Sequence, residues 1–228
     1  YEISNVKELQ WMKYDLDNNY VLVNDIDASA TQSWNGDNGF DPIGENSDIP
    51  FEGSFDGGGY VVKDLYINRS STDNIGLFGR MDGVLENIGV ENVNIEGNSK
   101  VGSLVGSNNG MVSNCYSTGS VIGNGPSVGG LVGSNTSGTI RNSYSLARVV
   151  SSSNNVGGLV GYNNNEFGGG ISYSYSASEN VSGISDVGGF VGASANPIYE
   201  NNFWDNEVSN QIQDSGSSGG LENVYAVS

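Results

Sequence analysis

A hydrophobic phrase that closes on glycine recurs along the chain and organises the rest of it. The phrase V-G-G-L-V-G begins at Val128 and at Val156, and a copy with Phe in place of Leu begins at Val187. Looser copies begin at Ile75 and Val101. The closing glycines follow one another at steps of 27, 27, 28 and 31 residues, at Gly79, Gly106, Gly133, Gly161 and Gly192. A period of this size indicates an array of stacked supersecondary units.

Two further hydrophobic columns keep the same period, so each repeat carries three short β-prone pieces. The first column is aliphatic and the second is made of valine; their members are Leu85, Val112, Ile140, Ile171 and Ile198, and Val93, Val121, Val149 and Val181. Three strands per coil return the chain to its starting side, and successive coils stack at about 4.8 Å. This stacking places Leu131, Leu159 and Phe190 in one interior ladder. The pattern predicts a right-handed parallel β-helix of roughly six or seven coils, since parallel crossovers are strongly right-handed.

Glycine and asparagine mark the turns between these pieces. Glycine allows corners that need positive φ or close backbone approach. Asparagine tolerates the left-handed conformation, and its amide can hydrogen-bond the next copy above it. A column of Asn87, Asn114 and Asn142 lies two residues past the aliphatic column and is predicted to fill such corners.

Aromatic residues form a second periodic feature. Tyr116, Tyr144 and Tyr175 lie four residues past the aliphatic column. This even offset favours partial burial of the rings, packed against the core with the hydroxyl at the rim. The alternative is an exposed aromatic strip that stacks on sugars. Three further aromatic residues are predicted to belong to the caps or core rather than to a binding platform: Trp11, Trp34 and Trp204.

The segments that flank the repeats suggest how the solenoid ends. Residues 6–16 form the only convincing helix, with Leu9, Met12 and Leu16 at helical spacing and Ser4 or Asn5 as its cap. We expect this helix to cover one end of the β-helix, which would otherwise expose strand edges. The chain then divides into a cap with the first coils (1–74), the repeats (75–208) and a polar tail (209–228), within one continuous domain.

Composition excludes several classes of function. The net charge is −18 and there is no histidine, so nucleic acid and anionic membranes are disfavoured as partners. Cys115 is the single cysteine, which leaves no intrachain disulfide and predicts a small buried residue rather than a nucleophile. No apolar run reaches about 18 residues, so we expect no membrane insertion. The chain begins at Tyr1, which we interpret as excision from a larger protein, and it is expected to be monomeric.

The glycine phrase at this spacing resembles the GLUG motif repeats of large prokaryotic surface proteins, which include bacterial and archaeal adhesin-like proteins. The lead-in over residues 22–57 and the close over 202–211 are similar to the stretches that flank such repeats. The resemblance implies an extracellular location, at the cell surface or attached to the cell wall. It brings no catalytic motif with it.

The acidic lead-in is the best candidate for a cation site. Asp25 and Asp27 lie one residue apart, and further acidic residues follow at Asp37, Asp41, Glu45, Asp48 and Asp56. Calcium takes six to eight oxygen ligands from carboxylates and carbonyls. We therefore predict calcium as the one candidate cofactor, with Asp25 and Asp27 as its ligands. The alternative is that these aspartates form turns and caps, because the spacing matches no known calcium loop.

Two classes of function remain. The first is a non-catalytic adhesin-like module, which acts as a rigid spacer or binds a glycan or protein of a host or neighbouring cell surface. The second is a carbohydrate-active β-helix enzyme, a polysaccharide lyase or glycoside hydrolase; it is disfavoured because residues 101–190 hold only three acidic side chains. Binding residues concentrate on loops held by a rigid scaffold. The candidate binding residues therefore lie in the longer loops, 163–170 and 178–186: Asn163, Asn164, Glu166, Phe167, Glu179 and Asp186.

Overall fold

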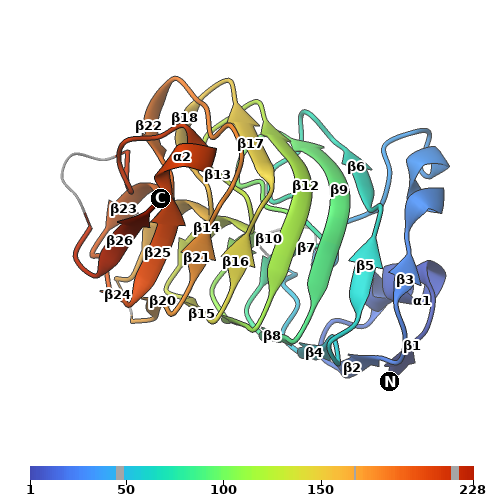
Figure 1. Ribbon diagram of the computed structural model, residues 1–228. Helices are drawn as coiled ribbons and strands as arrows, with labels where there is room; N and C mark the ends of the chain where they lie inside the picture. The colour runs from blue at the N-terminus through green and yellow to red at the C-terminus, as the bar shows by residue number, and fades with distance from the viewer. Residues whose placement is uncertain (45–48, 167, 217–220) are drawn as a thin grey trace.

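The chain winds into a parallel β-helix with a short helix over its N-terminal end (Figure 1). The computed structural model describes residues 1–44, 49–166, 168–216 and 221–228. Four sheets run along the solenoid, and their paired strands are parallel, as predicted from the repeat.

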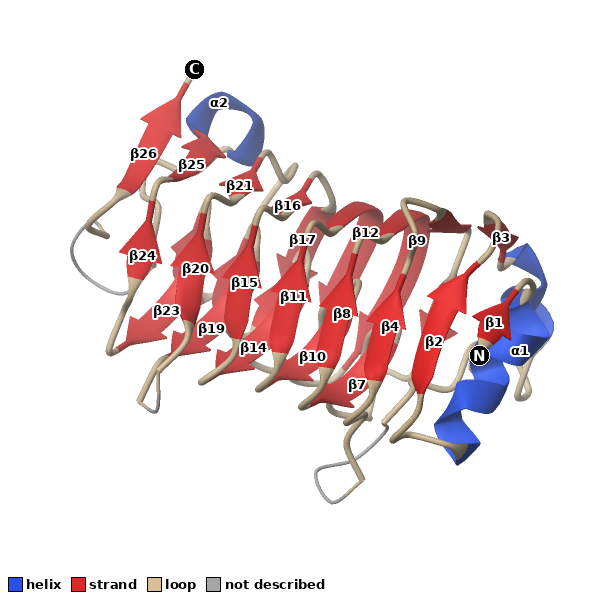
Figure 2. Cartoon of the chain, turned by 90° about the horizontal axis from the view of Figure 1, so that it is seen from below, coloured by secondary structure: helices blue, strands red, loops and turns tan. Residues whose placement is uncertain are grey.

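Two long sheets form the main walls. Sheet A, seen side by side in Figure 2, has the strand order β1 (Glu2–Ile3), β2 (Asn19–Leu22), β4 (Ser54–Asp56), β8 (Val84–Glu86), β11 (Met111–Ser113), β15 (Thr139–Arg141), β20 (Gly170–Ser172) and β24 (Tyr199–Glu200). Sheet B, which faces the viewer in Figure 1, has the order β26 (Val224–Val227), β25 (Asn202–Asp205), β21 (Tyr175–Ser176), β16 (Tyr144–Ser145), β12 (Tyr116–Gly123), β9 (Gly89–Gly97), β5 (Val61–Lys63) and β3 (Ile26–Asp27), with β17 (Arg148–Ser151) on β12 and β6 (Tyr66–Asn68) on β9.

Two shorter sheets close the coil. Sheet C has the order β23 (Val191–Ala195), β19 (Val160–Asn164), β14 (Val132–Thr136), β10 (Val105–Asn108) and β7 (Phe78–Met81). Sheet D is made of β13 (Val128–Gly129), β18 (Asn154–Gly157) and β22 (Ser185–Gly188). The five strands of sheet C correspond to five full coils, where the sequence predicted six or seven; the other strands of sheets A and B belong to partial coils at the two ends.

The glycine phrase keeps its register through the stack. Val132 pairs with Val105 on one side and with Val160 on the other, so the closing glycines of successive coils align. The ladder predicted at Leu131, Leu159 and Phe190 is fully buried. Two column members were misplaced by one or two residues. Tyr199, not Ile198, pairs with Ile171, and Ile95, not Val93, pairs with Val121, because a register shift precedes that pair.

The phrase needs glycine because backbones approach closely at this corner. A Cβ on Gly133 would lie 2.4 Å from the carbonyl carbon of Lys100, and one on Gly161 would lie 2.4 Å from the amide nitrogen of Val128. Gly192 is equally confined, 2.3 Å from the amide nitrogen of Val156. None of these three glycines has a φ in the left-handed region. Of the two reasons predicted for glycine here, close approach is therefore the operative one.

A ladder of asparagine amides runs through the interior of sheet C. The Nδ2 of Asn108 donates to Oδ1 of Asn135 at 2.7 Å, and the Nδ2 of Asn135 donates to Oδ1 of Asn163 at 2.8 Å. The Nδ2 of Asn163 then donates to the hydroxyl of Tyr199 at 3.0 Å. All three asparagines are fully buried. Each amide both donates and accepts, so the buried polar groups satisfy one another from coil to coil.

The N-terminal end is capped by α1 (Val6–Trp11) and the 3₁₀ turn η1 (Met12–Tyr14). The Oδ1 of Asn5 accepts hydrogen bonds from the amides of Lys7 and Glu8, as its predicted capping role requires. Helical geometry ends at Tyr14 rather than at residue 16. The chain leaves the helix at Asp15, whose φ is −150°, and the Leu16 carbonyl instead accepts the amides at 52 and 53.

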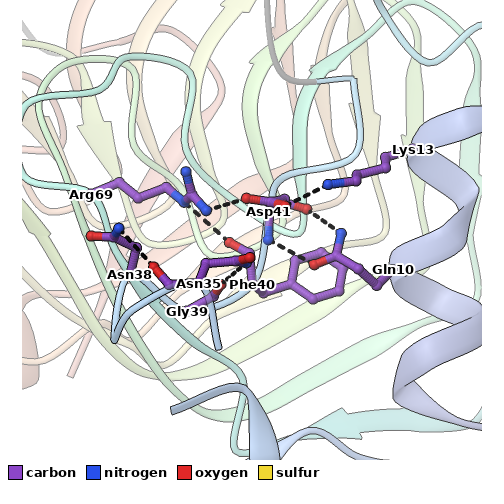
Figure 3. A network of polar contacts seen from close by, with 8 residues as sticks. All are labelled: Gln10, Lys13, Asn35, Asn38, Gly39, Phe40, Asp41 and Arg69. Atoms are coloured by element: carbon purple, nitrogen blue, oxygen red, sulfur yellow. Dashed lines mark hydrogen bonds and ion pairs between the residues drawn. The ribbon is translucent and has the colours of Figure 1, made fainter. Parts of the chain in front are cut away.

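Asp41 joins this cap to the first coil (Figure 3). Its side chain pairs with Lys13 of η1 at 2.5 Å and with the guanidinium of Arg69. Its backbone forms two hydrogen bonds of 2.8 Å with the Gln10 amide. The cap is thus held by directional polar contacts as well as by the buried Leu9 and Met12.

The other end also differs from the prediction. Within the segment 209–228, which was predicted as a polar tail, the described residues add a partial coil. Ser215 bridges to Val191, and β26 pairs with β25 through Phe203 and Tyr225. The short helix α2 (Asn206–Ser209) and the 3₁₀ helix η2 (Ser29–Ser33) complete the secondary structure that the described residues show.

Candidate functional site

Both ends of the first predicted binding loop, 163–170, belong to strands of the stack. Asn163 and Asn164 close strand β19, and Asn163 is 0% exposed because its amide belongs to the interior ladder. Asn163 is therefore not a binding residue, and the prediction for it was wrong. Asn164 is half-buried and Glu166 is exposed, while Phe167 lies outside the described residues.

The second predicted loop is shorter than expected. Glu179 is exposed at a turn, but Asp186 already belongs to β22 and is half-buried. Asp186 has a φ of 52° and accepts a hydrogen bond from the Ser185 hydroxyl at 3.1 Å. Glu166 and Glu179 thus remain as exposed loop candidates.

The two aspartates predicted to bind calcium serve separate purposes. Asp25 pairs with Lys63 at 3.0 Å and accepts the amide of Val61 at 3.2 Å. The hydrogen bond from Lys63, with that from Val61, holds the pKa of Asp25 below its usual value. Asp27 accepts the amide of Ser29 at 2.9 Å, which also lowers its pKa. Nowhere in the described ranges do three or more acidic or cysteine side chains gather closely enough to hold a metal ion.

Other aspartates of the first coils accept hydrogen bonds from asparagines of the next coil. The pairs are Asn87 to Asp56 at 3.0 Å, Asn98 to Asp73 at 2.7 Å, Asn109 to Asp82 at 2.9 Å, and Asn92 to Asp64. A carboxylate can only accept, so it suits the first position of a column whose next member donates an amide. These contacts give the acidic residues at 56, 64, 73 and 82 a structural role at the corners.

The tyrosine column lies on the outer face of sheet B and not in the core. Tyr116 pairs with Tyr144, and Tyr144 with Tyr175, while the next residue in each of these strands is a buried serine. The rings are partly buried, as predicted, but they do not pack in the core, because Asn114, with φ of 55°, lies at the corner between the aliphatic residue and the tyrosine and changes the alternation. The column continues through Phe203 and Tyr225.

We call these five residues, Tyr116, Tyr144, Tyr175, Phe203 and Tyr225, the aromatic strip. Its first three members are half-buried, whereas Phe203 is 42% exposed and Tyr225 is 48% exposed. The rings of Tyr116 and Tyr144 stack with 5.0 Å between centroids and 7° between planes. Aromatic groups aligned over successive coils give this wall an amphipathic surface that suits contact with a partner.

The hydroxyl of Tyr116 donates to Oε1 of Glu91 at 2.6 Å. Burial raises the pKa of Tyr116 above its usual value, and the contact with Glu91 adds to the shift. The ring of Tyr116 lies over Gly89, where a Cβ would come within 2.3 Å of its Cζ. Glycine at position 89 therefore leaves the space that the ring of Tyr116, the first member of the strip, occupies.

Cys115, beside the strip, is 1% exposed, and burial raises the pKa of its thiol to about 12. It is a poor nucleophile at neutral pH, as expected for a small buried residue. The amide of Cys115 donates to the Ser143 hydroxyl of the next coil.

The three tryptophans separate into different environments. Trp204 is buried and Trp34 is half-buried against the core, as predicted. Trp11 belongs to the capping helix α1, in line with its predicted place in a cap, but its side chain is 68% exposed. The helical stripe of Leu9 and Met12 faces the core, so Trp11 is turned to solvent.

Comparison with known proteins agrees with this architecture. The model of the GLUG motif family matches residues 97–122 and 124–150. Halomucin of Haloquadratum walsbyi is 43% identical over 143 residues, which is 59% of this chain and 2% of that protein. A "Putative Gly-rich membrane protein" of Evansella cellulosilytica is 39% identical over 100 residues, 42% of this chain and 11% of that protein. The chain thus spans only a small part of the length of these relatives.

A solved structure shares the fold. It is described as a "putative immunoglobulin A1 protease" from Bacteroides ovatus and superposes with a TM-score of 0.70 over 100% of this chain and 84% of that one, at 20% identity. At this identity the likeness concerns the fold alone. No helix in the described part of this chain is long and apolar enough to cross a membrane. The chain carries GLUG motifs in two consecutive repeats of a β-helix, and the GLUG-repeat resemblance seen in its sequence is confirmed.

Proposed function

We propose that this chain is a non-catalytic, extracellular module of a large cell-surface protein, where it acts as a rigid spacer and presents the aromatic strip to a glycan or protein partner. The observation that carries the proposal is the continuous in-register stacking of sheet A from β1 to β24. In such an array each coil is held by hydrogen bonds and core contacts with both neighbours. A mechanical load at one end is then transmitted along a stiff axis, and a partner bound at one end is held at a fixed distance from the other.

The surface chemistry supports the same role. A net charge of −18 favours solubility and opposes self-association, which suits a spacer. The GLUG matches and the great length of the relatives support a place within a larger surface protein. The name of one relative, a membrane protein, is in keeping with an extracellular or surface location.

The enzyme alternative finds little support in the outer walls. A β-helix lyase needs a group that can take a proton, yet burial and Glu91 raise the pKa of Tyr116, and Glu200 raises that of Tyr173. A glycoside hydrolase needs two facing carboxyl groups. The groove beside Ile171 and Ile198, about 330 Å³, has Glu200 as its one carboxylate.

The spacer role is tested by small-angle X-ray scattering of the purified chain. A rigid module should reproduce the profile calculated from this structure, with one cross-sectional radius along its length. A larger maximum dimension that varies between preparations would show a flexible chain and would contradict the spacer.

The binding role is tested on a glycan and host-protein array. The wild type is compared with Tyr144→Ser/Tyr175→Ser on the strip and with the matched control Val84→Ser/Met111→Ser on the outer face of sheet A, where both residues are half-buried. Binding lost only in the strip variant supports an adhesive face. An absence of binding leaves the spacer alone, and release of reducing sugar or unsaturated product from a polysaccharide would favour the enzyme.

A further inference from the structure

A pocket opens on the N-terminal cap, between β1, the α1–η1 segment and β2. Its volume is about 330 Å³. Three aromatic residues line it, Tyr1, Trp11 and Tyr20, above the buried side chains of Ile3 and Met12. We call it the cap pocket. Its elements β1 and α1 lie at the opposite end of the molecule from β25 and β26, the strands that carry the last two residues of the aromatic strip (Figure 1).

The aromatic walls of the cap pocket are unusually open to solvent. Tyr1 is 72% exposed and Trp11 is 68% exposed, while Tyr20 forms a fixed wall at 7%. The rings of Tyr1 and Tyr20 lie 5.7 Å apart, and the hydroxyl of Tyr20 donates to the Asp15 carbonyl at 2.6 Å. Large apolar groups gathered around a hollow on a soluble protein mark an interaction site.

The charged side chains that line the cap pocket are all acidic: Glu2, Glu8 and Asp15. The amide and hydroxyl of Ser4 hold Glu8 at 2.8 and 2.9 Å, and these bonds lower the pKa of Glu8. The amide of Asn18 holds both oxygens of Asp15 at 2.7 Å. The N-terminal ammonium of Tyr1 is engaged with the Asn19 carbonyl at 2.6 Å. The pocket therefore combines aromatic faces with carboxylates held in place near them.

We propose that the cap pocket binds a quaternary ammonium group, with Trp11 and Tyr1 as its aromatic contacts and Glu2, Glu8 and Asp15 as its counter-charges. Cations are attracted to the faces of aromatic rings, most strongly to tryptophan. A methylated nitrogen is weakly hydrated and apolar on its surface, so it gains from the rings and the carboxylates together. An anionic ligand would be repelled by the three carboxylates. A primary ammonium would have to give up more of its hydration to enter.

The test is ligand-observed NMR of the intact chain titrated with choline and, in parallel, with 3,3-dimethylbutan-1-ol, in which carbon replaces the charged nitrogen. We expect saturable transfer to the choline methyl groups, little transfer to the neutral alcohol, and weakening of the choline signal by added sodium chloride. Butylammonium should bind more weakly than choline.

Trp11→Ala should weaken choline binding by about fivefold or more, because the strongest cation–π contact is removed. Trp11 is exposed, so the variant should keep its fold, which circular dichroism will verify. Tyr14→Ala is the matched control, an exposed aromatic residue of the same segment that does not line the pocket, and it should bind as wild type does. Glu8→Gln should also weaken binding. Equal transfer to the neutral alcohol, wild-type binding by Trp11→Ala, or no choline signal at millimolar concentration would each overturn the proposal.

Discussion

Asparagine occupies two kinds of column in this solenoid, and the surroundings decide its role in each. In the interior of sheet C, Asn108, Asn135 and Asn163 exchange amide hydrogen bonds with no access to water. At the outer corners, Asn87, Asn114 and Asn142 adopt the left-handed conformation predicted for them. The amide group suits both positions, because it can donate to one coil and accept from another.

We expect Asn135→Asp to lower the free energy of unfolding by about 3 kcal/mol or more. The new carboxylate would face Oδ1 of Asn163, would no longer donate to Gly138, and would be buried without a counter-charge. Urea denaturation followed by circular dichroism measures the change. Asn164→Asp is the matched control, since Asn164 is half-buried at the end of the neighbouring strand β19 and the substitution should cost less than about 1 kcal/mol. Equal losses in the two variants would show that the interior ladder is not as described.

Asp214 is a residue whose environment opposes its charge. It is buried beside β23; its Oδ2 accepts the amide of Leu221 at 3.0 Å, whereas its Oδ1 has no hydrogen-bond partner among the residues that the structure describes. Burial raises the pKa of Asp214. Because the pKa of Asp214 is raised in the folded state, the protonated side chain favours folding relative to the ionised one. This contribution to the free energy of unfolding is fully present below the unfolded-state pKa, about 3.9, and is lost as pH rises through the folded-state pKa.

We therefore expect Asp214→Asn to be more stable than the wild type at pH 7, with a difference that shrinks as pH falls toward about 4. Denaturant titrations at three pH values in this range measure it. Asp17→Asn, at an exposed position, is the control, and its difference in the free energy of unfolding from the wild type should not shrink in this way as pH falls. A difference for Asp214→Asn that grows on acidification would contradict the assignment.

At the scale of elements, the cap depends on polar contacts as well as on apolar burial. The α1–η1 segment buries Leu9 and Met12, but Gln10 and Lys13 fix its position on Asp41 (Figure 3). Removing the carboxylate of a largely buried ion pair takes away the attraction that offset the burial of both charges.

Asp41→Ala should lower the free energy of unfolding by about 2 kcal/mol or more, because Lys13 and Arg69 both lose their carboxylate. Amide hydrogen exchange should rise first in α1 and η1, while the strands of sheet C stay protected. Asp17→Ala removes the same charge from an exposed site and should leave exchange in the cap unchanged. Uniform loss of protection along the whole solenoid would mean that the cap is not a separate unit.

At the scale of the whole molecule, the solenoid carries a net charge of −18, and a bound cation would reduce the repulsion between its carboxylates. Calcium is the one cofactor that the sequence predicted. Asp25 and Asp27 are already engaged with Lys63 and with the Ser29 backbone. From this geometry we expect the melting temperature to be the same in millimolar calcium and in chelator at constant ionic strength. A rise with calcium that Asp25→Ala abolishes would instead establish the predicted site by mass action.

The sequence by itself determined the period, the register of the glycine phrase, the interior ladder of Leu131, Leu159 and Phe190, and the end that carries the capping helix. These follow because similar residues that recur once per coil must stack on one another along the axis. The column of Asn108, Asn135 and Asn163 is also visible in the sequence, since each residue lies two positions past a closing glycine. Its burial is not, because asparagine in a turn-rich chain is typical of exposed corners.

The tertiary structure alone decided which side of a wall each column faces. The left-handed corner at Asn114 sends Tyr116 outward, although its spacing from Val112 favoured the core. Likewise, tertiary pairing buried Asn163 in a strand that reads as a loop, and drew the segment after α2 into a further coil. The spacing of residues along the chain determines which side chains stack on one another along the axis. The face of the sheet that a side chain occupies depends instead on the φ of single corner residues, and the closure of the coil sets that φ.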